Sequence, residues 1–305
     1  MSTPLRSPAA LPAAPAPLPA SAALLQLFLC ALWGFTQIAT KLANAGISPV
    51  FHAGLRSAGA TLLLLAWIAW RRVPLLERDG TLRAGLLVGA LFAVEFMFLY
   101  TGLNHTSAAR ATLLLYAAPF VVALGAHWLV PGERLTRAKL AGLVAAFGGL
   151  VLAFADRLGG TDASGLLGDA LCLAAAAGWG ATTLVVKTTG LRRAAPEKTL
   201  LYQLAVSAVL LLAGAALLGE RGLFAPSPLV WSLLAWQIVV VAFASYLLWF
   251  GLVSRHRATT LHAFTFLTPI FGVCFAWLLL DEPVTPALLG ALALTAGGIL
   301  LVNRA

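Results

Sequence analysis

The chain is built from long apolar runs separated by short polar connections. Runs of about 20 apolar residues are long enough for a helix to cross a bilayer. Ten such stretches can be read along the chain: 22–42, 50–70, 84–103, 107–130, 138–155, 166–187, 198–218, 229–252, 258–280 and 286–303. The runs are continuous, whereas barrel strands alternate apolar and polar positions. The pattern therefore predicts an all-α integral membrane protein with ten transmembrane helices.

The ten segments form an internal repeat. "ALWGFTQIATK" (31–41) closes the first segment, and "AGWGATTLVVK" (177–187) closes the sixth. The similarity continues into the fourth and ninth segments, where Pro119 aligns with Pro269. The chain thus consists of five predicted spans written twice.

An odd number of spans in each copy inverts the second copy in the membrane relative to the first. This inverted-topology repeat is common among alternating-access carriers. We expect a Pro/Ala-rich cytoplasmic tail at 1–21, a first repeat at 22–156 and a second repeat at 165–303. Prolines at 8, 12, 15, 17 and 19 interrupt the tail, so it has no apolar signal-peptide region.

Composition agrees with a membrane protein. Hydrophobic residues make up 61% of the 305 positions and charged residues 10%, whereas soluble domains have roughly 25% charged residues. The net charge of +9 does not indicate nucleic-acid binding, because the basic residues sit between apolar runs. Of the 20 Lys and Arg residues, 15 fall on the side of both termini. The other side has Lys41, Arg56, Arg110, Arg157 and Arg221. This bias predicts cytoplasmic termini.

These motifs resemble the ten-helix EamA-type members of the bacterial drug/metabolite transporter superfamily. The resemblance rests on the two Trp-Gly…Lys phrases, "HAGLRSAGATLLLL", "GLNHTSAARATLLLYAAP", "PGERLT" and "DEPVTPALLGALALTAGGILLV". It implies a cofactor-free secondary carrier of the bacterial inner membrane with two EamA repeats. Such carriers export amino acids, other small metabolites or amphipathic drugs, and some relatives exchange nucleotide sugars or phosphorylated sugars.

The Trp-Gly…Lys phrases supply the first candidate site residues. Trp33, Gln37 and Lys41 lie on one helix face, four residues apart, as a mixed aromatic, polar and cationic stripe. The equivalent stripe in the second copy is Trp179, Thr183 and Lys187. Two interpretations remain open for the lysines, which either extend to the membrane interface or take part in gating or substrate binding.

Arg56 and Glu95 are the most unusual charges, because charged groups inside the bilayer are costly. Each lies six or seven residues from the outer end of its span, roughly 10 Å deep at about 1.5 Å per residue. Adjacent antiparallel helices could therefore pair them. The alternatives are a neutralising ion pair, a proton-coupling carboxylate at Glu95, or contacts to a substrate's amino and carboxylate groups.

The remaining candidates are less specific. Tyr116 and Gln203 are candidates for the wall of a central cavity, and Pro119 and Pro269 are expected to kink the fourth and ninth spans. The paired glycines Gly148-Gly149 and Gly297-Gly298 favour close helix packing, with a homodimer contact as the alternative.

Several function classes are disfavoured. No H-E-x-x-H, G-x-S-x-G or Walker A sequence occurs, so the chain lacks the usual signatures of a zinc enzyme, a serine hydrolase or an ATPase. No selectivity loop typical of a channel is visible. We expect an exporter of amino acids or similar small amphipathic metabolites, with proton coupling as one option. Exchange of nucleotide sugars or phosphorylated metabolites, and multidrug export, are the alternatives.

Overall fold

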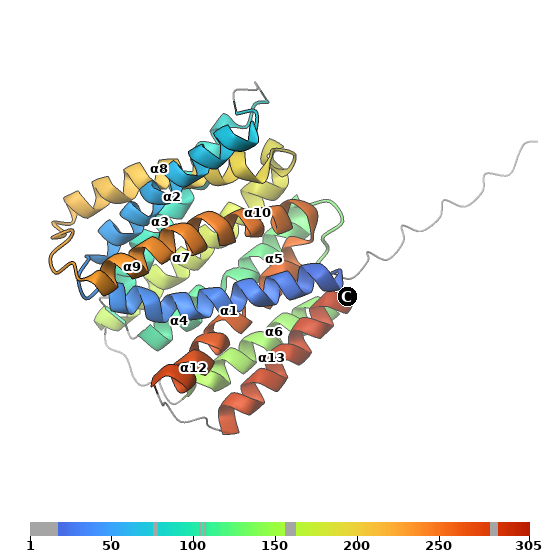
Figure 1. The fold of residues 1–305 in the computed structure, drawn as a ribbon. Coiled ribbons are helices and arrows are strands. Elements are labelled where there is room, and N and C mark those ends of the chain that lie inside the picture. The colour runs from blue at the N-terminus through green and yellow to red at the C-terminus, as the bar shows by residue number, and fades with distance from the viewer. Residues whose placement is uncertain (1–17, 76–78, 104, 107, 156–162, 281–285) are drawn as a thin grey trace, which may run out of the picture.

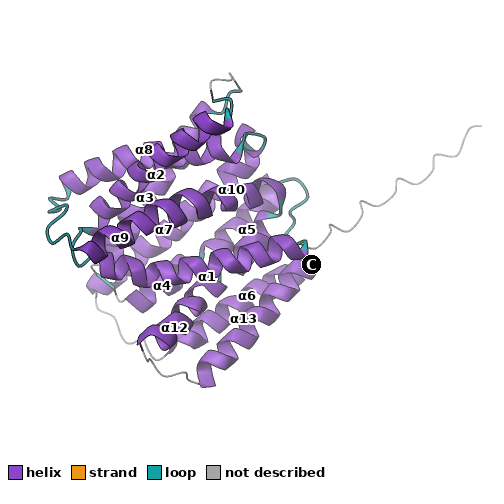
Figure 2. Cartoon of the chain, viewed as in Figure 1, coloured by secondary structure: helices purple, strands orange, loops and turns teal. Residues whose placement is uncertain are grey.

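The computed structural model describes residues 18–75, 79–103, 105–106, 108–155, 163–280 and 286–305. Regular structure in these ranges is helical, apart from one isolated bridge between Ile47 and Leu223 (Figure 2). The longer elements are α1 (Ala20–Ala43), α2 (Pro49–Arg71), α3 (Leu82–Leu103), α4 (Ala108–Leu115), α5 (Ala118–Leu129), α6 (Arg137–Phe154), α7 (Ala163–Thr188), α8 (Pro196–Leu217), α9 (Pro228–Trp236), η3 (Gln237–Ser245), α10 (Tyr246–Arg255), α11 (Ala258–Phe264), α12 (Leu267–Leu280) and α13 (Pro286–Arg304).

Helices occupy all the predicted apolar segments. Within the described residues, eight stretches are long and apolar enough to cross a membrane, from Ala20–Thr40 to Pro228–Arg255. The ninth predicted segment is divided into α11 and α12, and the apolar part of α13, Leu289–Arg304, is shorter than the other stretches. The all-helical, multi-pass class is confirmed, while the count of ten spans and their inversion stay predictions.

Both predicted proline kinks coincide with breaks in a helix. α4 ends at Leu115 and α5 begins at Ala118, next to Pro119, while α11 ends at Phe264 and α12 begins just before Pro269. Proline lacks the N–H that would continue the ladder, and its ring excludes the carbonyl four residues earlier. The carbonyl of Phe264, the last residue of α11, accepts a hydrogen bond from the Cys30 thiol at 3.3 Å.

The segment η3 is a second irregularity. It is a π-helix of nine residues between α9 and α10, so the predicted eighth span is helical throughout but changes pitch in its middle. Such π segments are rare and are often found at functional sites. Ser245 at its end is a contact of Trp33, as described below.

The helices pack in matching pairs from the two halves of the chain. α2 lies against α8, and α6 lies against α13, side by side in Figure 1. α1 crosses α12, and α7 crosses α5 in the equivalent way. The Leu18 amide donates to Asn303 Oδ1 at 2.9 Å, so the start of α1 and the end of α13 meet at one end of the bundle.

One glycine of each predicted pair, Gly149 and Gly298, packs helices together inside the chain. A Cβ on Gly298 of α13 would lie 2.4 Å from the carbonyl oxygen of Gly142 on α6. A Cβ on Gly149 would lie 2.7 Å from the carbonyl oxygen of Ala291. Without side chains at these positions, α6 and α13 approach to backbone contact, as small-residue helix interfaces do in membranes.

Glu220, which follows α8, connects the second half of the chain to the first turn of α2. Its carboxylate oxygens accept the backbone amides of Val50 at 3.1 Å and Phe51 at 2.7 Å. These amides belong to the first turn of α2, where no helical carbonyl is available to them. A carboxylate at this position also meets the positive end of the helix dipole, a contribution of about 0.3–1 kcal/mol.

We expect Gly298→Ala to lower the thermal stability of the purified protein in detergent. The new Cβ would clash with backbone atoms of α6, so the helices must separate, at a typical cost of about 1–3 kcal/mol. Gly297→Ala is the matched control, because no atom lies within 4 Å of its Cβ position. Equal unfolding temperatures for the two variants would contradict the close α6–α13 contact.

Candidate functional site

The glycine of each Trp-Gly pair lies at a close helix crossing. A Cβ on Gly34 would be 2.7 Å from the carbonyl oxygen of Thr268, beside the break between α11 and α12. A Cβ on Gly180 would be 2.7 Å from Cγ1 of Val121 on α5. The same phrase therefore brings α1 onto α12 and α7 onto α5, and it sets the direction of the adjacent tryptophan.

Trp33 begins a cluster of aromatic side chains in the interior. Its indole N–H donates to Ser245 Oγ at 2.9 Å. Its ring meets Tyr246 and Trp249 of α10 edge-on, with centroids 6.4 and 5.5 Å apart. Edge-to-face contacts of this kind are favourable for aromatic rings. Trp33 is therefore anchored to the end of the π-helix and to α10.

Trp179 continues the cluster from the other half of the chain. Its ring lies 5.7 Å from Tyr116, at the break between α4 and α5, and 5.3 Å from His262 of α11. His262 also lies 5.3 Å from Trp249, which joins the two parts of the cluster. Thr183 is 2.8 Å from His262 Nε2 through its hydroxyl. We call this set, Trp33, Tyr116, Trp179, Tyr246, Trp249 and His262, the aromatic cluster.

Arg56 lies beside the aromatic cluster. The side chain is only 4% exposed, and its guanidinium carbon lies 4.7 Å from the centroid of Phe96 and 6.0 Å from that of Tyr246. No Arg56 nitrogen is within 4.0 Å of a carboxylate among the described residues. The cation is thus held against ring faces.

Glu95 lies near Arg56 without contacting it. Its side chain is 7% exposed, and a Cβ on Gly178 of α7 would lie 3.5 Å from the Glu95 Cβ. Glu95 is therefore placed against the residue that precedes Trp179. The direct ion pair with Arg56 considered from the sequence is not formed, because α3 packs mainly on α7 and α8 rather than on α2.

The structure brings most of the candidate residues together. Trp33, Tyr116, Trp179 and Thr183 belong to the aromatic cluster or contact it, and Arg56 reaches it through Tyr246. Gln203 is buried on α8, and among the described residues it has no side-chain hydrogen bond to the cluster. The side chains of Gln37 and Lys41 lie outside the described part of the structure.

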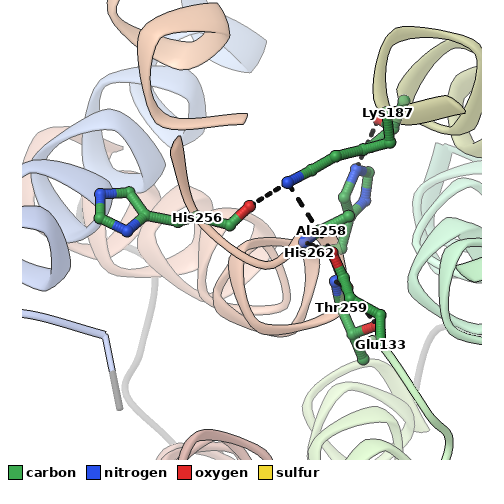
Figure 3. A network of polar contacts seen from close by, with 7 residues as sticks. Glu133, Lys187, His256, Ala258, Thr259 and His262 are labelled. Atoms are coloured by element: carbon green, nitrogen blue, oxygen red, sulfur yellow. Dashed lines mark hydrogen bonds and ion pairs between the residues drawn. The ribbon is translucent and has the colours of Figure 1, made fainter. Parts of the chain in front are cut away.

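Lys187 is buried and held by protein groups, rather than extended to an interface. Its ammonium donates to the carbonyl of His256 and lies 3.7 Å from Glu133 Oε1 (Figure 3). Glu133 in turn accepts the backbone amides of Ala258 at 2.9 Å and Thr259 at 3.1 Å. One carboxylate thus caps the first turn of α11 and neutralises the lysine at the end of α7.

A cavity of about 230 Å³ lies beside this network. Arg192, Arg255, His256 and Arg257 contribute to its lining together with Glu133 and Lys187, so the charged groups of its wall are mostly cations. Burial, with the charges of Lys187 and Arg255 nearby, lowers the pKa of His256 below its ordinary value. His256 is therefore a neutral group at this mouth of the bundle at pH 7.

The site thus consists of the aromatic cluster, the charges of Arg56 and Glu95 beside it, and the network of Lys187 at one end of the bundle. The described residues include no cluster of metal ligands. The EamA-like transporter family model matches residues 20–155 and again 166–304. The chain belongs to the EamA-like transporter family. It is accordingly a multi-pass membrane transporter and not an enzyme.

Proteins of similar sequence support the family assignment, and they include both uncharacterized transporters and probable efflux pumps. The chain is 30% identical to the uncharacterized transporter YvbV of Bacillus subtilis (strain 168), over 92% of this chain and 91% of that protein. It is 28% identical to a probable amino-acid metabolite efflux pump of Escherichia coli (strain K12), over 90% and 92%. A crystal structure with 22% identity matches the fold with a TM-score of 0.77, over 92% of this chain and 98% of that one.

His262, Ser245 and Glu133 were not among the site residues predicted from the sequence of this transporter. A single histidine or serine in an apolar helix has no local pattern that marks it. Glu133 had one usable signal, since it aligns with Glu282 in the repeat, but its contact to α11 joins residues 125 positions apart. Glu282 itself lies outside the described residues.

We expect Glu133→Gln and Lys187→Met each to lower the unfolding temperature, and the double variant to lose less than the sum. Neutralising one residue of the pair leaves the other as a buried charge without its partner. Residues that are coupled in this way typically show interaction energies of about 0.5–3 kcal/mol. Arg192→Gln is the matched control, because it lines the same cavity without an ion pair to Glu133. Additive effects for Glu133 and Lys187 would exclude their coupling.

Proposed function

We propose that this chain is a secondary transporter of the bacterial inner membrane that exports amino acids or similar small amphipathic metabolites by alternating access. In this proposal both termini are cytoplasmic, and the ten helical segments form two inverted five-helix repeats. The observation that carries the proposal is the aromatic cluster, which both halves of the chain build together, with Arg56 and Glu95 beside it.

Matched features of the two halves support the inverted repeat. Gly34 and Gly180 make equivalent helix crossings, and the segments next to them are interrupted before Pro119 and Pro269. Interrupted helices at the interface of two repeats are typical of substrate sites in secondary transporters. The bias of Lys and Arg toward the side of the termini supports the orientation.

The chemistry of the site suits an amphipathic substrate. Aromatic faces can hold an apolar side chain, while Arg56 and Glu95 offer one charge of each sign. Two relatives at 28% identity are named probable amino-acid metabolite efflux pumps, in Escherichia coli and Salmonella typhimurium. These names support the substrate class without identifying a particular amino acid.

Exchange of phosphorylated substrates is the weaker alternative. A phosphate or diphosphate needs several cations in the site. Arg110 is engaged by Asp169, and Lys187 is engaged by Glu133 and the His256 carbonyl. Arg110 and Lys187 are thus used within the protein, which leaves Arg56 as the cation of the described residues that contacts the aromatic cluster.

Counterflow in proteoliposomes tests the proposed function. Vesicles loaded with an unlabelled amino acid are expected to accumulate the same labelled amino acid transiently, because a carrier exchanges the two. A panel of aromatic and aliphatic amino acids, phosphorylated sugars and amphipathic cationic drugs separates the alternatives. Exchange confined to phosphorylated sugars or to drugs would overturn amino-acid export.

We expect Glu95→Gln to abolish uphill transport driven by a pH gradient and to retain counterflow. Glutamine preserves the shape of the side chain and removes the proton that a coupling carboxylate would exchange. Glu197→Gln, at the first turn of α8, is the control and should behave as wild type. Unchanged pH-driven transport in Glu95→Gln would assign Glu95 to the scaffold.

A further inference from the structure

The Arg56 guanidinium is a buried cation without a hydrogen bond from the protein. Its Nε and Nη2 atoms are covered and have no acceptor. None of the hydrogen bonds among the described side chains involves Arg56 either, although a guanidinium offers five N–H donors. A buried charge in this condition is strongly unfavourable, so the site is chemically incomplete as the protein alone builds it.

The neighbouring acidic groups do not complete it. Glu95 lies more than 4.0 Å from the guanidinium, against Gly178. Glu220, on the loop beyond α8, gives both of its oxygens to the backbone amides of Val50 and Phe51. Each nearby carboxylate is therefore either held elsewhere or out of contact with Arg56.

The rings around Arg56 decide what kind of partner fits. The guanidinium carbon lies over the rings of Phe96, at 4.7 Å from its centroid, and of Tyr246, at 6.0 Å. Aromatic ring faces attract the charge but provide no carboxylate or carbonyl acceptor, so the buried Nε and Nη2 groups are left without partners. A planar carboxylate accepts two such N–H groups at once, with both charge and shape matched.

The surroundings of the guanidinium can admit such a group. Trp33, Phe96 and Tyr246 are only partly buried, although they contact the buried Arg56 or one another. Phe96 and Tyr246 are the partly buried rings that lie directly beside the unpaired donors. A small molecule with a carboxylate at one end and an apolar group at the other would contact both.

We propose that Arg56 is the carboxylate-binding residue of the transporter and that it selects substrates with one carboxylate attached to an apolar or aromatic body. This inference rests on the proposed function, because it names the group by which the site of an amino-acid exporter would recognise its substrate. Amides and esters of the same molecules lack the two negatively charged carboxylate oxygens, so they bind poorly. Glu95 nearby disfavours substrates with a second negative charge.

The test compares phenylalanine with phenylalaninamide as competitors of labelled phenylalanine counterflow. The two molecules share the ring and the ammonium and differ in the carboxylate. Wild type is expected to prefer phenylalanine by on the order of tenfold or more, the range for hydrogen bonds to charged groups. Arg56→Gln is expected to bring the preference close to one, with little change in inhibition by phenylalaninamide.

Two further variants keep the result interpretable. Arg71→Gln, on the same helix, removes a guanidinium that lies 5.6 Å from Trp67, and it should retain the wild-type preference. Arg56→Lys keeps the charge without the planar fork and should have an intermediate preference. It also provides the measurement if Arg56→Gln does not yield a monodisperse protein. A wild-type preference retained in Arg56→Gln or Arg56→Lys would overturn the role of Arg56.

Binding without transport separates this inference from the proposed function. Thermal stabilisation of the purified protein is measured with phenylacetate and phenylacetamide. If wild type exchanges no amino acid but phenylacetate stabilises it, and Arg56→Gln loses that effect, amino-acid export fails and the carboxylate site stands. If wild type exchanges phenylalanine and phenylalaninamide equally well, the carboxylate site fails and the transporter stands.

Discussion

The interrupted helices, α4–α5 and α11–α12, impose the constraint on which the rest of the structure depends. A break inside an apolar bundle frees backbone groups, and in lipid those groups must find partners within the protein. At the break between α11 and α12, the Cys30 thiol donates to the carbonyl of Phe264, the last residue of α11. α1 and α7 cross beside the breaks at glycines, and the tryptophan next to each glycine enters the aromatic cluster. The need to hold a broken backbone therefore also determines where the site forms.

Two groups of charges in the bundle have different surroundings. At the helix ends, Arg110 pairs with Asp169, Lys198 with Asp79, and Lys187 with Glu133, so each cation ties one element to another. Beside the aromatic cluster, Arg56 and Glu95 have no ion-pair partner among the described residues. Paired charges are well explained as structural links. The unpaired ones are unfavourable in the protein alone, which is the physical reason to connect them with a ligand or a proton.

The family assignment and the substrate proposal rest on different kinds of observation. The family model covers both halves of the chain, and the relatives span nearly its whole length. The similar crystal structure, at 22% identity, supports the fold alone. Substrate chemistry has to be argued from the side chains of the site, because related transporters share helix packing and breaks while the groups that face a substrate can differ.

Much of the architecture was predictable from local pattern. Apolar runs of sufficient length can only be helices in a bilayer, and prolines at matched positions predict the breaks before Pro119 and Pro269. The repeat predicted that Trp33 and Trp179 have equivalent positions, and glycine beside each predicted close helix approach. These features depend on a few neighbouring residues, so the sequence by itself determined them.

Only the tertiary structure decided which distant groups meet. The sequence allowed Arg56 and Glu95 to pair, because both lie at similar depth on consecutive helices, but α3 packs on α7 and α8 and the pair is not formed. Lys187 and Glu133, which are in contact, lie 54 positions apart in the sequence. Trp33 and Ser245, which share a hydrogen bond, lie 212 positions apart. Periodicity places a residue on one face of its own helix, whereas the neighbour of that face depends on how all the helices pack together.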